Sequence, residues 1–176
     1  LPFVTVVLPT LNEETHINNC LRALQQQTYP NNCYEVVVVD NGSTDRTVEI
    51  VQQYGVQLLF ESRRSAYCAR NQAIQNSEGD YIALIDADCT ADSQWLETLV
   101  SAIENTEAFI AGGMIIYDVV KDTFSNRLLA ERNSPEQRRT LVSEHHAVAA
   151  GNMLVRRVAF ERHGLFAEAA YSSDIE

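Results

Sequence analysis

Short apolar runs alternate with amphipathic stretches along much of this chain. The apolar runs are rich in β-branched and aromatic residues, and each is followed by apolar residues at helical spacing. Pro9 closes the first run, so the first strand is expected to end there. The expected strands cover 3–8, 34–40, 56–60 and 81–85.

Capping residues and turn residues separate these strands from the expected helices. The residues from Thr10 to Glu14 supply caps and early acids for a helix that runs to about Gln27. Ser43 or Thr44 can cap a second helix that ends near Gly55. Further helices are expected over 65–76 and from Asp92 onward. This alternation predicts a doubly wound, mostly parallel α/β sheet, Rossmann-like, with helices on both faces.

The second part of the chain follows a less regular pattern. One or two strands are expected over 108–120, and a polar stretch follows over 121–144. The segment 146–155 is apolar again, and a short helix over 156–163 is expected to end at Gly164.

The buried run 81–85 leads directly into two carboxylates, Asp86 and Asp88. If the strand continued past Ile85, its period of two would place both acids on the same side. Ligands of open α/β sheets bind at the carboxyl ends of strands, and paired aspartates suit Mg²⁺ or Mn²⁺. The alternative is that one aspartate caps the next helix and the other is solvated.

Composition bounds the class of protein. A chain of 176 residues predicts one domain over 1–176, and its net charge of −11 argues against a nucleic-acid surface. No apolar run approaches the roughly 20 residues of a spanning helix, so no membrane segment is expected in this chain. The four cysteines show no metal-ligand spacing, which favours reduced thiols in the cytoplasm. The abrupt end of the sequence suggests a fragment truncated at its C-terminal end.

Two common phosphate-binding motifs are absent. Neither the Gly-x-Gly-x-x-Gly fingerprint nor the Gly-x-x-x-x-Gly-Lys-Ser/Thr loop follows the first strand, and the chain has a single lysine. What remains is an acid after the second strand, Asp40, an arginine on the third helix, Arg70, and the acid pair. Together these could hold a base, a diphosphate and a divalent metal.

Several motifs in order resemble the family-two glycosyltransferases, which have the GT-A fold. The similarity covers nearly the whole chain, including the Gly151-Asn152 stretch and the segment from Gly164 to Glu168. The blocks that carry it are Val6-Val-Leu-Pro9-Thr10-Leu-Asn12-Glu13, Val39-Asp40-Asn-Gly-Ser43-Thr44-Asp45, Ala69-Arg70-Asn71 and Asp86-Ala-Asp88.

The resemblance implies roles on the donor side of the site. Asp40 matches the acid that reads the uracil edge of a UDP-sugar, although it could also only brace the turn after the strand. Pro9 and Thr10 match the loop beneath the base. Glu13 matches an acid near the ribose, with a helix cap as the alternative.

It also implies roles at the diphosphate. Arg70 matches an arginine that contacts the nucleotide. Asp88 matches the acid that binds the metal, Mn²⁺ or Mg²⁺. Asp86 matches the acid that approaches the ribose or sugar and shares the metal site.

The same resemblance points to a catalytic base near the end of the chain. The matching residue is Asp174, although the acid that usually precedes the base is Ser173 here, and Glu176 is the second candidate. The family downstream of this point commonly carries acceptor contacts or membrane helices, so the full-length protein could lie at the inner face of the membrane.

The expected function is therefore metal-dependent, inverting transfer of a sugar from a nucleotide-diphosphate sugar, a UDP-sugar above all, to an acceptor hydroxyl. The acceptor would be a saccharide or a lipid-linked sugar. The alternatives are a sugar nucleotidyltransferase and a non-catalytic nucleotide-sugar-binding domain.

Overall fold

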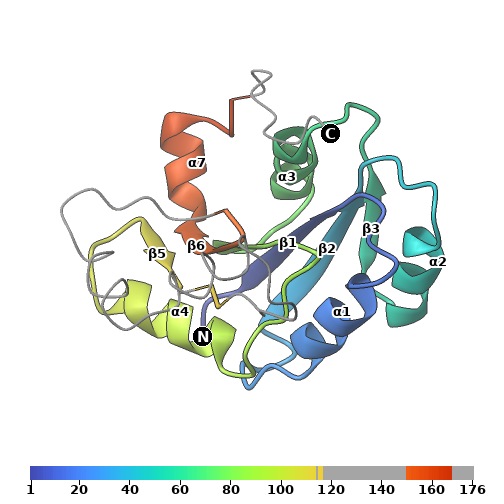
Figure 1. Ribbon diagram of the computed structural model, residues 1–176. Coiled ribbons are helices and arrows are strands. Elements are labelled where there is room, and N and C mark those ends of the chain that lie inside the picture. Colours follow the sequence, from blue (N-terminus) through green and yellow to red (C-terminus); the bar gives the residue numbers. More distant parts are fainter. Residues whose placement is uncertain (114, 117–149, 168–176) are drawn as a thin grey trace, which may run out of the picture.

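A computed structural model describes residues 1–113, 115–116 and 150–167 of the chain. The strands within these ranges form one six-stranded sheet in the order β3-β2-β1-β4-β6-β5 (Figure 1). The strands are β1 (Val4–Thr10), β2 (Tyr34–Asp40), β3 (Gln57–Phe60), β4 (Tyr81–Ile85), β5 (Ile110–Gly112) and β6 (Asn152–Arg156). The helices are α1 (Ile17–Gln25), α2 (Thr47–Val51), the 3₁₀ turn η1 (Gln52–Tyr54), α3 (Ala66–Gln75), α4 (Trp95–Glu104) and α7 (Arg157–His163).

The chain changes direction across the sheet at β1. β1, β2 and β3 lie side by side and parallel, and the chain then returns to place β4 parallel to β1 on its other side. β6 runs antiparallel to β4 and to β5. The carboxyl ends of β1 and β4 therefore meet at a topological switch point, the usual ligand site of an open α/β sheet.

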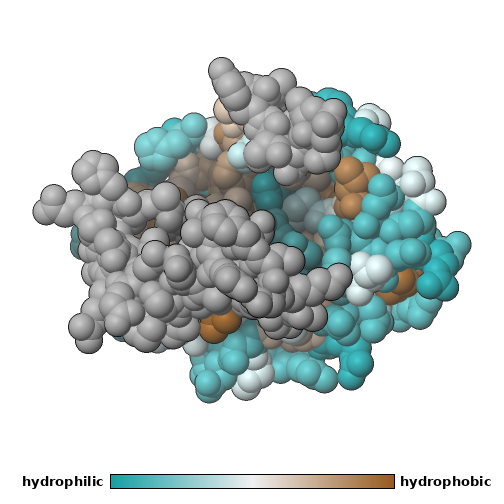
Figure 2. Space-filling view, viewed as in Figure 1, coloured by the Kyte–Doolittle hydropathy of each residue, from teal (hydrophilic) through white to brown (hydrophobic). Residues whose placement is uncertain are grey.

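Helices cover both faces of the sheet, as the alternating pattern predicts (Figure 1). Val6 and Leu8 of β1 face a core that is built with α1, α2 and α4, and Val7 faces a core built with α3 and α7. This alternation follows the two-residue period of a strand. The surface over α1 and α2 is largely hydrophilic, with isolated hydrophobic residues (Figure 2).

The first strand does not end at Pro9, and it extends two residues beyond the expected range of 3–8. β1 continues to Thr10, and Pro9 pairs with Val39 of β2. β1 pairs with β4 only as far as Val7, so Pro9 has a strand neighbour on one side only. Proline lacks the N–H that a second neighbour would need, and it is tolerated in this edge-like setting.

Two expected helices begin later in the structure than the sequence suggests. α1 starts at Ile17 instead of near Thr10, and α2 starts at Thr47 without a side-chain cap from Ser43 or Thr44. The polar residues that precede the two helices bind one another across the loops after β1 and β2.

Other expected boundaries agree closely with the structure. β2 has the expected bounds, and the hydroxyl of Ser65 caps α3 by accepting from the N–H of Cys68 at 3.4 Å. Gly164 ends α7 with a φ of 86°, a conformation that glycine adopts without strain. Within the described ranges, no helix is both long and apolar enough to cross a membrane.

Candidate active site

A cavity of about 620 Å³ lies at the switch point. Its walls come from the loop after β1, the turn after β4 and the first two turns of α3. The structure thus brings together residues from three distant parts of the sequence. Those that the sequence predicted for the donor site and that line this cavity are Pro9, Thr10, Glu13, Arg70, Asp86 and Asp88.

Asp86 and Asp88 leave the sheet through a turn. β4 ends at Ile85, and the N–H of Cys89 donates to the carbonyl oxygen of Asp86 at 3.0 Å. The two-residue period of the strand therefore does not extend to these residues. Both carboxylates still reach the same cavity, because the turn opens toward it.

Arg70 holds Asp86 in place from α3. One terminal nitrogen of the guanidinium donates to Asp86 Oδ1 at 2.7 Å, and the arginine side chain is 8% exposed whereas that of Asp86 is 44% exposed. The guanidinium also lies 5.8 Å from the centre of the Tyr67 ring. Its Nε is buried without a hydrogen-bond partner. A buried donor of this kind is costly unless a ligand or water supplies the acceptor.

Gly151 leaves room for the second carboxylate oxygen of Asp86, because it has no side chain. A Cβ at residue 151 would lie 2.5 Å from Asp86 Oδ2, well inside van der Waals contact. The backbone that leads into β6 therefore lies against the carboxylate, and a side chain at residue 151 would require Asp86 to shift. The family motif included Gly151, but no role could be assigned to it from the sequence.

The two carboxylates fit a metal that arrives with a diphosphate. Within the described residues no group of three His, Cys, Asp or Glu side chains could enclose an ion. Mg²⁺-type ions, however, bind through one or two carboxylates plus substrate phosphates and water, without a full protein cage. Asp88, which is exposed at the cavity, and Asp86 supply such a partial set.

Two thiols beside the acid pair carry no charge near neutral pH. Burial, reinforced by Asp88 and Asp86, raises the pKa of Cys89 to about 11. Burial likewise raises the pKa of Cys20 to about 12, and its Sγ lies 3.9 Å from the carbonyl oxygen of Asp86. The charge at this end of the cavity therefore comes from the carboxylates and Arg70.

Asp40 and Thr10 form a pair at the ends of adjacent strands. They are partners in the parallel register of β1 and β2, and both are buried at 3% exposure. Asp40 Oδ2 accepts from the N–H groups of Gly42 and Ser43, each at 3.1 Å. Asp40 Oδ1 and the hydroxyl of Thr10 are both buried without a partner. Asp40 thus braces the turn with one oxygen and leaves the other unpaired, and it lies behind Thr10 rather than among the residues that line the cavity.

The loops after β1 and β2 are tied together by reciprocal bonds. Asn12, in a left-handed conformation with φ of 55°, receives a bond from the N–H of Thr44 at 2.8 Å and donates its own N–H to Ser43 Oγ at 2.9 Å. The N–H of Glu14 donates to Asp45 Oδ2 at 3.1 Å. These bonds use the residues that the sequence assigned to helix caps, which explains the late starts of α1 and α2.

Glu13 serves both the cavity and the start of α1. Its carboxylate binds His16 Nδ1 at 2.9 Å, and its carbonyl accepts from the N–H groups of His16 and Ile17. Its own N–H donates to Thr47 Oγ1 at 2.7 Å. The N-cap of α1 is His16, without a side-chain cap bond, so the carboxylate of Glu13 does not cap the helix, and the residue lines the cavity.

A third loop, over 61–65, closes the cavity wall next to α3. The amide of Asn41 donates to the carbonyls of Glu61 at 2.9 Å and Arg63 at 2.6 Å, and its oxygen accepts from the N–H of Ser65 at 2.8 Å. The Glu61 carboxylate accepts from the N–H, Nε and a terminal nitrogen of Arg63 at 2.9, 3.1 and 2.8 Å. No sequence pattern signals this role of Asn41, because its partners in the loop over 61–65 are brought to it only by the fold.

The Glu61 contacts predict a pH-dependent contribution to stability. Hydrogen bonds from Arg63 lower the pKa of Glu61 to about 2, below the value of about 4.3 that is usual for an unfolded chain. A depressed pKa stabilises the fold above the unfolded value, and this contribution is lost as the pH falls toward 2. Glu61→Gln should therefore lower the free energy of unfolding at pH 7, and its difference from the unaltered chain should vanish toward pH 2.

Urea denaturation at a series of pH values measures this difference. Glu78→Gln, at an exposed position, is the control and should show no comparable dependence. A Glu61→Gln deficit that stays constant from pH 7 to pH 2 would contradict the assignment.

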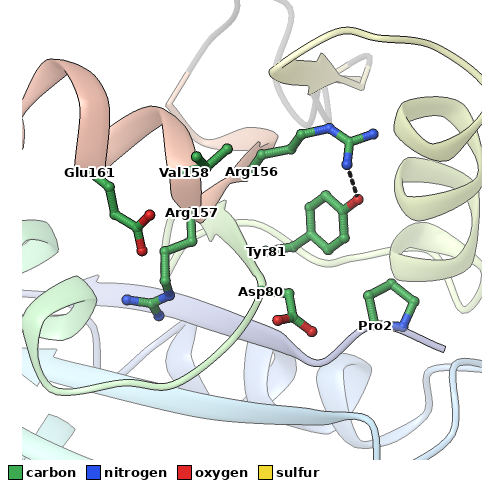
Figure 3. Close-up of a pocket in the computed structure, with 7 residues that line it drawn as sticks. All are labelled: Pro2, Asp80, Tyr81, Arg156, Arg157, Val158 and Glu161. Atoms are coloured by element: carbon green, nitrogen blue, oxygen red, sulfur yellow. Dashed lines mark hydrogen bonds between the residues drawn. The ribbon is translucent and has the colours of Figure 1, made fainter.

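A second cavity, of about 410 Å³, lies at the opposite ends of the strands, where β4 begins (Figure 3). Arg156 donates to the Tyr81 hydroxyl at 2.6 Å and to the carbonyls of Ile103 and Ala108 at 2.9 and 3.0 Å. Arg157 points away from Arg156 and donates to the carbonyl of Ile74 near the end of α3 at 3.0 Å and to that of Gly79 before β4 (Figure 3). Both guanidinium groups thus hold helix ends, and the cavity has a structural explanation.

Asp174, the predicted base, lies outside the described residues, as do Ser173 and Glu176. Its role stays a prediction. The described chain leads toward it as far as Ala167.

A mostly parallel sheet with acids, an arginine and a cavity at its switch point is the arrangement of the GT-A fold. The sequence model described as Glycosyl transferase family 2 matches residues 5–164. The chain belongs to this family.

Relatives with curated names agree with this assignment. The chain is 35% identical to glycosyltransferase AglE of Haloferax volcanii over 180 residues, which is 94% of this chain and 56% of that protein. It is 37% identical over 112 residues to the low-salt glycan biosynthesis hexosyltransferase Agl6 of the same organism, covering 64% of this chain and 27% of Agl6. The chain thus spans about half, or less, of the length of these relatives.

Solved structures show the same fold. S. aureus TarS 1-349 superposes with a TM-score of 0.70 at 20% identity, covering 97% of this chain and 52% of TarS 1-349. The mannosyltransferase PcManGT of Pyrobaculum calidifontis, in complex with GDP-Man and Mn²⁺, has a TM-score of 0.70 at 25% identity. That match covers 94% of this chain and 48% of PcManGT.

Proposed function

We propose that this chain forms the donor-binding core of an inverting glycosyltransferase that uses a UDP-sugar together with Mn²⁺ or Mg²⁺. One observation carries the proposal. Of the buried side-chain polar atoms that lack a partner among the described residues, three belong to the donor end of the sheet: Thr10 Oγ1, Asp40 Oδ1 and Arg70 Nε. Unpaired buried polar atoms are rare and costly in proteins, and a cluster of them indicates a ligand that supplies the missing bonds.

The pair Asp40 and Thr10 suits the base. A carboxylate oxygen accepts from a ring N–H, and a neighbouring hydroxyl can donate to a ring carbonyl. Uracil presents an N–H between two carbonyls, whereas cytosine presents no ring N–H at that position. The chemistry of the pair therefore favours a uridine nucleotide over a cytidine nucleotide.

Arg70 and the acid pair suit the diphosphate. Arg70 can direct its unpaired Nε to a phosphate oxygen while its terminal nitrogen keeps Asp86 in place. A divalent ion bound with the diphosphate would offset the charge that develops on the departing UDP. Inversion then requires only that a base accept the proton of the acceptor hydroxyl from the opposite side of the sugar, the role proposed for Asp174.

The named complexes support a nucleotide-sugar ligand in this fold. TarS 1-349 has been solved in complex with UDP-GlcNAc, and glucosyl-3-phosphoglycerate synthase from Mycobacterium tuberculosis in complex with Mn²⁺ and UDP. We propose a saccharide or lipid-linked acceptor, in line with the family resemblance.

A sugar nucleotidyltransferase is the less favoured enzyme. It would need a glycine-rich, basic loop after β1, whereas that loop here carries Glu13 and Glu14 and is tied to the loop after β2. Product analysis separates the three possibilities: a transferred sugar supports the glycosyltransferase, released pyrophosphate the nucleotidyltransferase, and neither product the binding domain.

A thermal-shift screen of nucleotide sugars with and without Mn²⁺ tests the proposal directly. A ligand that binds only the folded chain should add about 2.7 kcal/mol of stability at a hundredfold excess over its Kd. UDP with Mn²⁺ should stabilise the chain much more than UDP alone, and equal shifts would contradict the metal dependence.

Asp40→Ala should weaken UDP binding by about 1–3 kcal/mol, the scale of a hydrogen bond to a charged group. Asp40→Asn is the sharper variant, since its amide oxygen can still accept from Gly42 and Ser43 and keep the turn. Its NH₂ group would then meet the base, so this variant should lose UDP affinity and gain CDP affinity. Calorimetry with both nucleotides measures the change, and equal affinity of the unaltered chain for UDP and CDP would show that Asp40 does not read uracil.

A further inference from the structure

Asn71, the neighbour of Arg70 on α3, makes a two-point contact with a remote part of the chain. Its Nδ2 donates to the carbonyl oxygen of Phe166 at 2.8 Å, and its Oδ1 accepts from the N–H of Phe166 at 3.0 Å. The side chain is buried, at 4% exposure. One asparagine thus takes the place of a strand neighbour for a residue that lies outside any helix or strand.

The contact is specific for an asparagine. Ile74, one turn further along α3, and the ring of Phe166 both belong to an apolar core, so packing alone would favour an apolar residue at 71. Burying an amide among apolar groups is unfavourable unless its donor and acceptor are both satisfied. The two bonds to Phe166 supply that satisfaction.

The ring of Phe166 joins the same helix to the donor cavity. It lies 6.0 Å from the ring of Tyr67 and 5.4 Å, edge-on, from that of Phe160 in α7. Tyr67 and Arg70 both line the donor cavity. α3 therefore holds the donor-side residues on one side and the backbone of Phe166 on another.

We propose that Asn71 is a positioning residue for catalysis: it fixes the chain at Phe166 against the helix that holds the donor. The inference rests on the proposed function. Sugar transfer requires the groups on the acceptor side to be held at a fixed position relative to the donor. A displacement of such a group by about 1 Å can lower the rate about a hundredfold. Phe166 lies three residues past the end of α7. The contact with Asn71 therefore fixes the position from which the following part of the chain continues.

The test compares Asn71→Ala and Asn71→Asp with Asn76→Ala, an exposed asparagine at the C-terminal end of the same helix. The probes are UDP with Mn²⁺ for binding, and UDP-glucose and UDP-GlcNAc for turnover measured as released UDP. Hydrogen exchange of a peptide covering 160–167 reports on the Phe166 N–H. Asn71→Asp keeps an acceptor for that N–H but loses the donor and faces the carbonyl with a charge.

Both Asn71 variants should lose about tenfold to a hundredfold in kcat while the KM for the sugar nucleotide and the Kd of UDP stay unchanged. Exchange at Phe166 should accelerate in both, and Asn76→Ala should match the unaltered protein in every measurement.

Three outcomes would overturn the inference. If exchange accelerates while kcat is unchanged, anchoring Phe166 does not position a catalytic group. If UDP affinity and kcat fall together, Asn71 only supports the donor cavity. If the unaltered protein releases no UDP from either sugar nucleotide, the proposed function fails and the catalytic role of Asn71 fails with it. This third outcome is recognised from the unaltered protein alone, whereas the first two require the variants.

Discussion

Asp174→Asn is expected to abolish sugar transfer while leaving donor and metal binding intact. Inversion at the anomeric carbon is a single displacement, in which the acceptor hydroxyl attacks as UDP leaves. Arg70, Asp86 and Asp88 are all proposed to serve the leaving group, and Glu13, the other carboxylate among the described residues of the cavity wall, is engaged by His16. The incoming hydroxyl therefore needs a base from elsewhere in the chain, and loss of a general base typically lowers the rate by about 10²–10⁴-fold.

The measurement requires the full-length protein with its acceptor, and it compares kcat with the Kd of UDP in the presence of Mn²⁺. Glu176→Gln is the matched control, since Glu176 is a second carboxylate two residues further on. Turnover near that of the unaltered protein in Asp174→Asn, with loss in Glu176→Gln, would move the role to Glu176. Retention in both would place the base outside this segment.

Asp88→Asn is expected to abolish the metal-dependent part of donor binding and to leave the fold unchanged. Asp86 is engaged by Arg70, with its second oxygen against Gly151, so Asp88 is the carboxylate of the pair that is free to leave its present contacts. An amide is a far weaker ligand than a carboxylate for a hard cation. Because Asp88 is exposed, its replacement should leave the thermal stability of the ligand-free chain unchanged.

Calorimetry of UDP binding with and without Mn²⁺ measures the effect. The unaltered chain should bind UDP more tightly with Mn²⁺, and Asp88→Asn should bind it equally in both conditions. Asp92→Asn, an exposed aspartate that is not among the cavity-lining residues, is the control and should retain the Mn²⁺ effect. Unchanged UDP affinity with Mn²⁺ in Asp88→Asn would remove Asp88 from the metal site.

The sequence by itself determined the strands, the helices and the general position of the site. The runs 36–39 and 81–85 are continuous apolar segments, and a sheet covered on both faces buries such runs. Because the carboxyl ends of parallel strands share one edge, acids at the ends of two such runs are expected at that edge, where Asp86 and Asp88 line the cavity and Asp40 does not. Asp40, Asp86 and Asp88 could therefore be assigned to one region from the order of the residues alone.

Only the tertiary structure decided which atoms at that edge are engaged and which are left for a ligand. The register of β1 and β2 places Thr10 beside Asp40, and no local pattern specifies a register. The partners of Asn41 and Asn71 are backbone groups of other loops, and backbone groups carry no signal in the sequence. The late start of α1 has the same origin, since Asn12 and Glu14 bind the loop after β2 instead of capping a helix. Hydrophobic periodicity is a local property of the chain, whereas the hydrogen bonds of a site join residues whose proximity exists only after folding.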